Sequence, residues 1–323
     1  MKTTAAFTTH IDEDIKAVEI LMRSQADSYH SILAEALDVI LSSGGKRIRP
    51  ALVLLTGKML GAPKEQLICL SAAIELLHTA TLVHDDLIDQ SLMRRGAATL
   101  TSMWTPGATV LTGDFVFACA ADLAAQTNSL SVMRLFAKTL TTIVNGEISQ
   151  LFGSYDKVSR ENYNHRTYAK TASLFETSAC SAALISQVSD EVIENMRGFG
   201  RNIGIAFQFI DDILDFTGDQ AKLGKPTGTD LRQGVITLPT LIYIENNQEN
   251  PDVQYLVDGN NKKDSECINR LVESIRTSTA IQSAYEEANR FVESGLEHLE
   301  NQPPGPERKM LEDLARYIVQ RKL

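Results

Sequence analysis

The sequence predicts an all-α protein, and three observations support this. Long segments carry apolar residues at three- and four-residue spacings, with few turn signals between them. Runs rich in Val, Ile and Thr with strict alternation are nearly absent, so β structure should be minor. Neither a low-complexity linker nor a fixed-period repeat interrupts the chain. We therefore expect residues 1–323 to form one domain, a large helical bundle of about ten or more helices.

The clearest helix is predicted over Ile68 to Asp89, where Leu70, Ile74, Leu77 and Thr81 form one stripe. A second helix is expected to begin at Pro50, after the turn at Gly44-Gly45. Further along the chain, the stretch from Asn246 to Asp264 is polar and reads as surface loops around a short helix.

Proline and glycine mark the remaining breaks. Pro106 and Pro226 lie beside Gly107 and Gly224, where helices are expected to end or start. A group of three prolines, Pro303, Pro304 and Pro306, precedes a last helix that is expected to end in Arg321-Lys322.

The bulk composition is that of a soluble globular protein, with 43% hydrophobic and 22% charged residues. A formal net charge of -10 argues against nucleic acid as a partner. The first ten residues have no apolar signal core, and we expect no segment that spans a bilayer. The four cysteines are widely and irregularly spaced, which excludes a zinc ribbon or a CxxC redox site and favours the reducing cytoplasm.

Two acid clusters carry the functional argument. The first contains Asp85, Asp86 and Asp89, and the second contains Asp211, Asp212 and Asp215. In each, the first and last acids are four residues apart, hence on one helix face. Each cluster follows an apolar run, so three like charges collect near the negative end of a helix dipole. A bound cation relieves both problems, and carboxylates without His or Cys favour magnesium over zinc.

One such cluster alone is more often a solvated acidic face. Two clusters at matching helical positions, each preceded by core residues, favour a functional site over a solvated face. The simplest arrangement has the two helices facing each other across one cavity, with metal ions between them. Because magnesium prefers shared carboxylate and phosphate ligands, the expected partner is a diphosphate.

Basic residues flank the acid clusters in this otherwise acidic chain. Lys46 and Arg49 lie in the glycine-hinged turn before Pro50, where they can converge on an anion. Further positive charge comes from Arg94, Arg95, Lys170 and Lys225. Each is ordinarily a solvated surface residue, and its value here comes from its position beside the acids.

These motifs resemble those of the trans-polyprenyl diphosphate synthases, and are most similar to the medium- and long-chain members. The resemblance covers nearly the whole chain. Its segments are GGKRIRP at 44–50, HDDLID at 84–89, RRG at 94–96, Gly113-Asp114, Lys170-Thr171, FQFIDDILD at 207–215, Gly224-Lys225-Pro226 and GTDL at 228–231. It implies a helical bundle of the isoprenoid synthase type with a central cavity, small-molecule isoprenyl diphosphate substrates and a homodimer.

The resemblance also implies roles for individual residues. Three magnesium ions are expected, two held by Asp85 and Asp89 and one by Asp211, with Asp212 and Asp215 supporting Asp211. Together with these acids, Asp86, Arg94 and Lys170 are the expected catalytic residues. The allylic diphosphate would contact Arg94, Lys170, Gln208 and Lys225, while Thr171 orients that substrate. The diphosphate of isopentenyl diphosphate would be held by Lys46, Arg49, His78 and Arg95. A lone His on an apolar helix is more often a core residue, and only the family pattern assigns His78 to binding.

The implied reaction is head-to-tail condensation through an allylic carbocation, which requires a dry site. The stretch after Asp215 and the basic C-terminus are expected to close over it. The growing chain should enter a tunnel below the first acid cluster, past Ala80 and Thr81, one turn before Asp85. Short-chain members often place Phe or Tyr at this level, so the small residues here favour a product longer than geranylgeranyl diphosphate. In the opposing interpretation, Ala80 only permits close helix packing.

Three alternatives stay open from the sequence. The first is a geranylgeranyl diphosphate synthase, with another helix closing the tunnel. The second is a class I terpene cyclase, which the second aspartate cluster and the Lys46–Arg49 set disfavour. The third is a non-catalytic subunit of a heteromeric synthase, although such subunits tend to lose an acid cluster and both are intact here.

Overall fold

The computed structural model describes residues 10–42, 44–94, 96–152, 158–218, 226–258 and 264–321. The chain divides into two compact units. Unit 1 comprises Met1–Thr139, Thr177–Arg197 and Asn301–Leu314, and unit 2 comprises Leu140–Glu176, Gly198–Glu300 and Ala315–Leu323. The expectation of a single domain over 1–323 stays a prediction.

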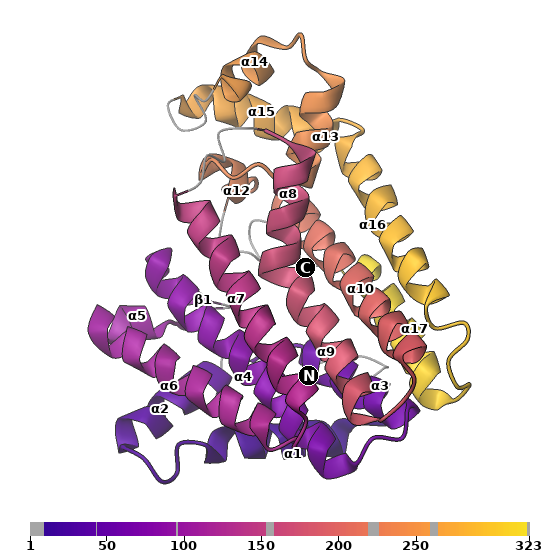
Figure 1. The fold of residues 1–323 in the computed structure, drawn as a ribbon. Helices are drawn as coiled ribbons and strands as arrows, with labels where there is room; N and C mark the ends of the chain where they lie inside the picture. The colour runs from indigo at the N-terminus through magenta and orange to yellow at the C-terminus, as the bar shows by residue number, and fades with distance from the viewer. Residues whose placement is uncertain are drawn as a thin grey trace. The chain divides into compact units, whose positions relative to one another are not determined.

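The N-terminal part of unit 1 is helical apart from one short hairpin (Figure 1). Its elements are α1 (Asp12–Ser24), α2 (Ser31–Ser42), α3 (Ile48–Met59), α4 (Lys64–Ile88), β1 (Met93–Arg94), β2 (Ala97–Ala98), α5 (Leu100–Met103) and α6 (Pro106–Ala125). The antiparallel strands pair Met93 with Ala98 and Arg94 with Ala97. They are the only strands in the described residues, which confirms the all-α prediction.

The remaining elements lie in unit 2 or contain residues of both units. Those of unit 2 are α8 (Arg160–Thr167), the π-helical turn η2 (Tyr168–Ala172), α12 (Thr229–Arg232), α13 (Leu238–Asn246), α14 (Pro251–Val257), α15 (Ser265–Thr277) and α16 (Ala280–Glu297). Those with residues of both units are α7 (Leu130–Phe152), α9 (Ser173–Ile185), α10 (Asp190–Thr217) and α17 (Pro306–Gln320). The polar stretch after Asn246 does contain one short helix, α14, as predicted.

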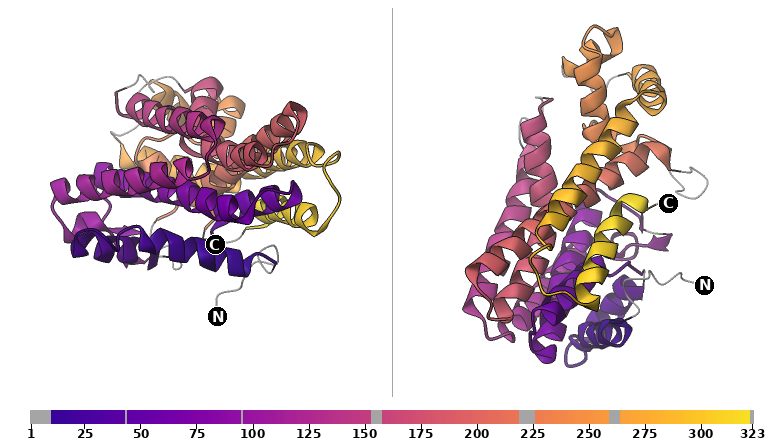
Figure 2. Two further views of the ribbon diagram at one scale, coloured as in Figure 1. Left: turned by 60° about the horizontal axis from the view of Figure 1, so that its bottom comes forward. Right: turned by 90° about the vertical axis from the view of Figure 1, so that its right-hand side faces the viewer.

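Helix α4 is the centre of unit 1, where it packs against α6, α3 and α1. The left view of Figure 2 shows the indigo N-terminal helices lying along the purple helices of this unit. The predicted stripe of α4 is confirmed, because Leu70, Ile74 and Leu77 are fully buried. The helix begins at Lys64 and not at Ile68, since the extended Pro63 starts it and its polar first turn has no apolar period.

Two other predicted boundaries were wrong. Helix α3 begins at Ile48, two residues before Pro50, because Arg47 adopts a left-handed conformation at the N-cap (φ +48°). Pro50 then lies within the first turn, where backbone N–H groups have no carbonyl partner within the helix, so the missing N–H of proline costs no hydrogen bond. At the other end of the chain, α17 ends at Gln320, so Arg321 lies outside the helix.

Two helices contradict the expectation that no segment reaches the length and hydropathy of a membrane span. Within the described residues, α4 and α6 each contain an 18-residue window that is apolar enough by composition. The α4 window is 67% buried and the α6 window 39%. Burial of most of the α4 window is the pattern of a core helix, because α4 packs against α1, α3, α5 and α6 within unit 1.

Close helix packing in unit 2 depends on two glycines of α10. A Cβ added to Gly200 would lie 2.5 Å from the carbonyl oxygen of Phe175, and one added to Gly204 would lie 2.6 Å from the Cα of Ala172. Both obstacles are backbone atoms, so neither can move aside without shifting the chain. The glycines therefore allow α10 to approach the segment that contains Lys170 and Thr171.

This packing generates a stability prediction for Gly204→Ala. The new methyl group overpacks the contact with η2, which costs about 1–3 kcal/mol. That cost exceeds the about 0.5–1 kcal/mol that alanine gains over glycine within a helix. Urea unfolding monitored by circular dichroism should therefore show a lower midpoint. Gly107→Ala in α6, where a Cβ meets nothing within 4 Å, is the control. An unchanged midpoint for Gly204→Ala would contradict the close contact.

Candidate active site

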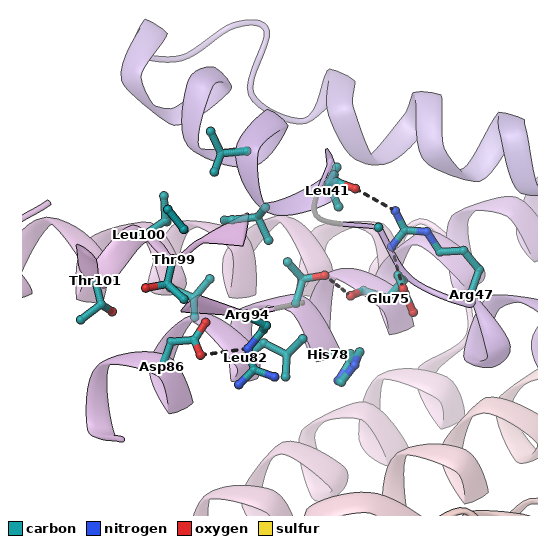
Figure 3. Close-up of a pocket in the computed structure, with 16 residues that line it drawn as sticks. Leu41, Arg47, Glu75, His78, Leu82, Asp86, Arg94, Thr99, Leu100 and Thr101 are labelled. Atoms are coloured by element: carbon teal, nitrogen blue, oxygen red, sulfur yellow. Dashed lines mark hydrogen bonds and ion pairs between the residues drawn. The ribbon is translucent and has the colours of Figure 1, made fainter. Parts of the chain in front are cut away.

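The first acid cluster lies at the C-terminal end of α4, and its three acids face different surroundings. Asp85 is half-buried, Asp86 is buried and Asp89 is exposed at the C-cap. The Nε of Arg94 donates to Oδ1 of Asp86 over 2.9 Å, and Figure 3 shows the two side chains facing each other. Successive helix residues point about 100° apart, so Asp86 turns inward while Asp85 and Asp89 keep the outer face. The structure thus brings together Asp86 and Arg94, two of the predicted residues.

The residue before this cluster explains the Gly113-Asp114 motif. The Nε2 of His84 lies 3.3 Å from the carbonyl oxygen of Val110 in α6 and 3.6 Å from Oδ1 of Asp114. A side chain on Gly113 would collide with the His84 ring. The glycine therefore makes room for the histidine, which ties the C-terminal end of α4 to α6.

An ion pair holds the basic loop of unit 1, and the sequence did not predict it. The guanidinium of Arg47 donates to Glu75 of α4 (2.8 Å) and to Glu19 of α1 (2.9 Å). Although burial lowers it, the pKa of Arg47 is held above its ordinary value by these two carboxylates. The only sequence signal was one acid, Glu75, inside an apolar stretch of α4.

A pocket in unit 1 connects this loop with the first acid cluster (Figure 3). Its apolar side is formed by residues such as Leu82, Val83 and Leu100. Its polar lining includes Arg47, Glu75, His78, Asp86 and Arg94, and Gly44 lies beside them. The predicted His78 therefore shares a pocket with Asp86 and Arg94. The neighbouring Lys46 is exposed and Arg49 is half-buried.

The second acid cluster, on α10, divides in a similar way. Asp211 is exposed, whereas Asp212 is buried with 2% of its surface exposed. Asp212 accepts hydrogen bonds from the Tyr163 hydroxyl (2.6 Å), the Gln208 amide (2.8 Å) and the backbone N–H of Leu238 (3.4 Å). Burial, with the charge of Asp230, raises the pKa of Asp212 to about 7, against the lowering effect of its donors.

The third acid of this cluster, Asp215, binds backbone rather than facing outward. Its two carboxylate oxygens accept from the backbone N–H groups of Thr229 and Asp230, each at 3.2 Å. These groups belong to the first turn of α12, whose free N–H groups attract a carboxylate. Asp215 therefore fixes the Gly228-Thr229-Asp230 motif, and its expected support of a metal ion at Asp211 stays a prediction.

The Lys170-Thr171 motif lies in the π-helical turn η2. The hydroxyl of Thr171 donates to the amide oxygen of Gln208 over 2.6 Å, and Gln208 in turn donates to Asp212. Tyr163 and Thr171 are eight residues apart, so in an ideal α-helix they would point about 80° apart. The wider π turn reduces this offset, and both side chains reach residues one turn apart on α10.

These contacts modify the roles expected for two residues. Gln208 uses both ends of its amide within the protein, one toward Thr171 and one toward Asp212. Lys170 forms an ion pair with Glu147 of α7 over 3.0 Å. Tyr163 did not figure among the sequence candidates, because nothing in its local pattern points to a carboxylate 49 residues away.

The C-terminal Arg321 contacts the second acid cluster. Its guanidinium is 2.5 Å from Oδ1 of Asp211, lies 4.0 Å from the centre of the Phe207 ring, and is almost fully buried. Arg321 therefore lies against Asp211, and closure of the C-terminus over the site stays a prediction. Arg95, Lys225, Lys322 and the stretch 219–225 lie outside the described residues, so their predicted roles are untested.

No three acids, histidines or cysteines converge on one point within the described residues. The outward carboxylates of Asp85, Asp89 and Asp211 are hard oxygen donors that fit magnesium or calcium together with phosphate oxygens. The two clusters belong to different units, so their arrangement across one cavity stays a prediction.

The proposed chain-length residues lie on α4, one turn before the first acid cluster. Ala80 is fully buried, and Thr81 is half-buried with its hydroxyl donating to the carbonyl oxygen of His78 over 2.7 Å. Both surroundings are compatible with close helix packing. The tunnel itself stays a prediction.

Comparison with known proteins gives a consistent result. Residues 30–275 match the family model described as polyprenyl synthetase. The chain is 33% identical to heptaprenyl diphosphate synthase component 2 of Geobacillus stearothermophilus, over 99% of both chains. It is 34% identical to solanesyl-diphosphate synthase 2 of Oryza sativa, over 96% of this chain and 78% of that protein.

The fold is likewise shared with a solved structure. A polyprenyl synthase from Caulobacter crescentus, crystallised with calcium and isoprenyl diphosphate, has a TM-score of 0.90 and 31% identity. The match covers 99% of this chain and 98% of that one. This agreement confirms the fold that the sequence motifs implied.

The buried hydrogen bond of Asp212 generates a second prediction. Tyr163→Phe keeps the ring and removes the donor. At a pH well above the Asp212 pKa of about 7, where this carboxylate is ionised, a hydrogen bond to a charged group contributes about 1.5–3 kcal/mol. We expect the free energy of unfolding, measured in urea, to fall by that amount. The control is Tyr243→Phe, a buried tyrosine of α13 in the same unit. An equal fall in the free energy of unfolding of both variants would show that the hydrogen bond to Asp212 adds no stability of its own.

Proposed function

The chain belongs to the polyprenyl synthetase family, and from this premise we propose that it makes an all-trans polyprenyl diphosphate longer than geranylgeranyl diphosphate. It is a trans-prenyltransferase, and the proposed reaction joins isopentenyl diphosphate head to tail to an allylic diphosphate. The starters would be dimethylallyl, geranyl, farnesyl or geranylgeranyl diphosphate. The main support is that each acid cluster satisfies its inner carboxylate within the protein and still presents carboxylate outward.

We propose that divalent metal ions bind at Asp85, Asp89 and Asp211, and that they are three magnesium ions. The calcium and isoprenyl diphosphate in the Caulobacter relative support a divalent ion together with this class of ligand. When bound, the ions would neutralise charge on the departing diphosphate. Asp86, Asp212 and Asp215 support the ligands by fixing Arg94, Gln208 and the start of α12.

The basic residues would hold the two diphosphates. Arg94 and Lys170, with Lys225, are proposed to contact the allylic diphosphate. Lys46, Arg49, His78 and Arg95 are proposed to contact isopentenyl diphosphate. Gln208 is better placed to orient Thr171 than to bind diphosphate by itself, because both ends of its amide are already bonded.

The proposed reaction consists of three steps between the two substrates. The allylic C–O bond breaks, and its electron pair leaves with diphosphate. The double bond of isopentenyl diphosphate attacks the resulting cation and forms the new C–C bond. The released diphosphate then takes a proton, and the electron pair of the broken C–H bond forms the new double bond. Arg94 and Lys170 would stabilise the charge that grows on the leaving group.

The proposed product length rests on two observations. The two curated relatives are named for heptaprenyl and solanesyl products. Ala80 and Thr81 are small where a bulky side chain would close a tunnel that begins at the first acid cluster. We also propose a cytoplasmic location, which fits four cysteines that form no disulfide.

The Geobacillus relative is named component 2, which suggests that related chains can work together with a different chain. We propose a homodimer, and the alternative is a complex with a different chain. In either case we expect this chain to carry out catalysis, because both acid clusters are intact. Activity of the purified chain alone, with its mass in solution, separates the two.

A product assay tests the proposed function. The purified chain is incubated with magnesium, labelled isopentenyl diphosphate and each of the four starters, and chain length is read after dephosphorylation. We expect a ladder that ends beyond geranylgeranyl and that chelator abolishes. Termination at geranylgeranyl would contradict the proposed length and keep the reaction. No elongation by the chain alone would favour the heteromeric assembly.

The chain-length residue has its own test. Ala80→Phe should shorten the product by at least one five-carbon unit, because the added ring would fill the proposed tunnel one turn below Asp85. Ala80→Ser is the matched control, since it adds only one atom. An unchanged product distribution in Ala80→Phe, with activity retained, would disprove the tunnel at this level.

A further inference from the structure

The basic loop (residues 44–50, of which the last three form the start of α3) contains three cationic residues, and one of them faces inward. The side chain of Arg47 is 12% exposed, while Lys46 before it is exposed and Arg49 after it is half-buried. Arg47 also adopts a left-handed backbone (φ +48°) that residues with a side chain rarely occupy. Such a conformation persists where surrounding interactions hold it.

The acceptors that hold Arg47 come from three helices. Its Nη1 donates to Glu75 of α4 (2.8 Å), its Nε to Glu19 of α1 (2.9 Å), and its Nη2 to the carbonyl oxygen of Leu41 in α2 (3.4 Å). Figure 3 shows Arg47 turned toward both Leu41 and Glu75. A fork of donors aimed at several acceptors fixes the direction of a guanidinium and of the backbone that carries it.

Glu75 is the inward half of this pair. Its side chain is 7% exposed, between fully buried Ile74 and Leu76 in α4. An ion pair with so little exposure is weak evidence for stability, because desolvation offsets much of the attraction. A buried pair can instead fix one conformation, which is the role that this geometry suggests.

Glu75 also lies next to the helix position of His78. The two are three residues apart, hence on one face of α4, and both line the pocket that Gly44 and Arg47 share. The pair therefore joins the loop of Lys46 and Arg49 to the helix face of His78. These are the three described residues proposed to hold isopentenyl diphosphate.

We infer that Arg47 and Glu75 are positioning residues, which set the diphosphate subsite for isopentenyl diphosphate without touching the substrate. This inference rests on the proposed function. Lys46 and Arg49 are adjacent to Arg47 or two residues away, so a loop released from Glu75 would misplace both cations. A misplacement of about 1 Å in a substrate-positioning group can lower the reaction rate by about a hundredfold.

The test compares two variants that each neutralise a buried carboxylate of unit 1. Glu75→Gln removes the charge that holds Arg47. Asp14→Asn removes the charge of a buried carboxylate of α1 that pairs with Lys58 and with Lys64 (2.9 Å), away from the loop. Binding of isopentenyl diphosphate alone, and of farnesyl diphosphate with magnesium, is measured by calorimetry, together with the thermal midpoint. Lys46→Ala serves as the reference for direct loss of the subsite.

Glu75→Gln should weaken isopentenyl diphosphate at least tenfold, and farnesyl diphosphate less than threefold. Asp14→Asn should lower the thermal midpoint and leave both affinities within threefold. Two results would overturn the inference: an unchanged isopentenyl diphosphate affinity in Glu75→Gln, or an equal loss in Asp14→Asn. If Lys46→Ala leaves this affinity unchanged, the proposed subsite itself is wrong.

A double variant keeps the inference testable if Glu75→Gln does not fold. Arg47→Gln combined with Glu75→Gln leaves no unpaired buried charge and should recover the thermal midpoint. Because the contacts to Glu19 and Leu41 are lost as well, affinity for isopentenyl diphosphate should stay at least tenfold reduced. Recovery of both the midpoint and the affinity would show that the pair serves stability alone.

Discussion

A carboxylate buried inside a helical protein loses its water and requires donors in return. Three such carboxylates organise the described parts of the candidate site. Their donors are Arg94 for Asp86, Arg47 for Glu75, and Tyr163 with Gln208 for Asp212. Apart from Gln208, each donor comes from an element other than the helix that carries the acid. Satisfying the carboxylate therefore fixes the position of a loop or helix that also contains a substrate-facing candidate.

The same constraint separates the acids within each cluster. Adjacent helix residues diverge by about 100°, so two consecutive aspartates cannot both face a ligand and cannot both face the core. The inner acid becomes structural, and the outer acid faces away from the core, where Asp211 pairs with Arg321. The last acid differs between the clusters, because Asp89 is exposed while Asp215 holds the first turn of α12. Equal spacing in the sequence thus does not imply equal roles.

The helices and the outward acids could be predicted from the sequence because both depend on local periodicity. The stripe of α4 and the exposure of Asp211 follow from positions within a few residues of one another. The pairs that hold the site could not be predicted in this way. Arg47 and Glu75 are 28 residues apart and Tyr163 and Asp212 are 49 apart, and neither pair leaves a local signal. The start of α3 was misplaced for a related reason, since the left-handed Arg47 depends on those distant acceptors.

The π turn at η2 has a consequence for how this region can change through evolution. A π turn holds one residue more than the α-helical turn that it replaces, so it records a single-residue insertion. Deleting Ala169 would leave Tyr163 and Thr171 seven residues apart, and in a regular α-helix this spacing puts the two side chains only about 20° apart. Both could then still reach α10. The π turn therefore lets this helix gain or lose one residue while Tyr163 and Thr171 keep facing the same neighbour.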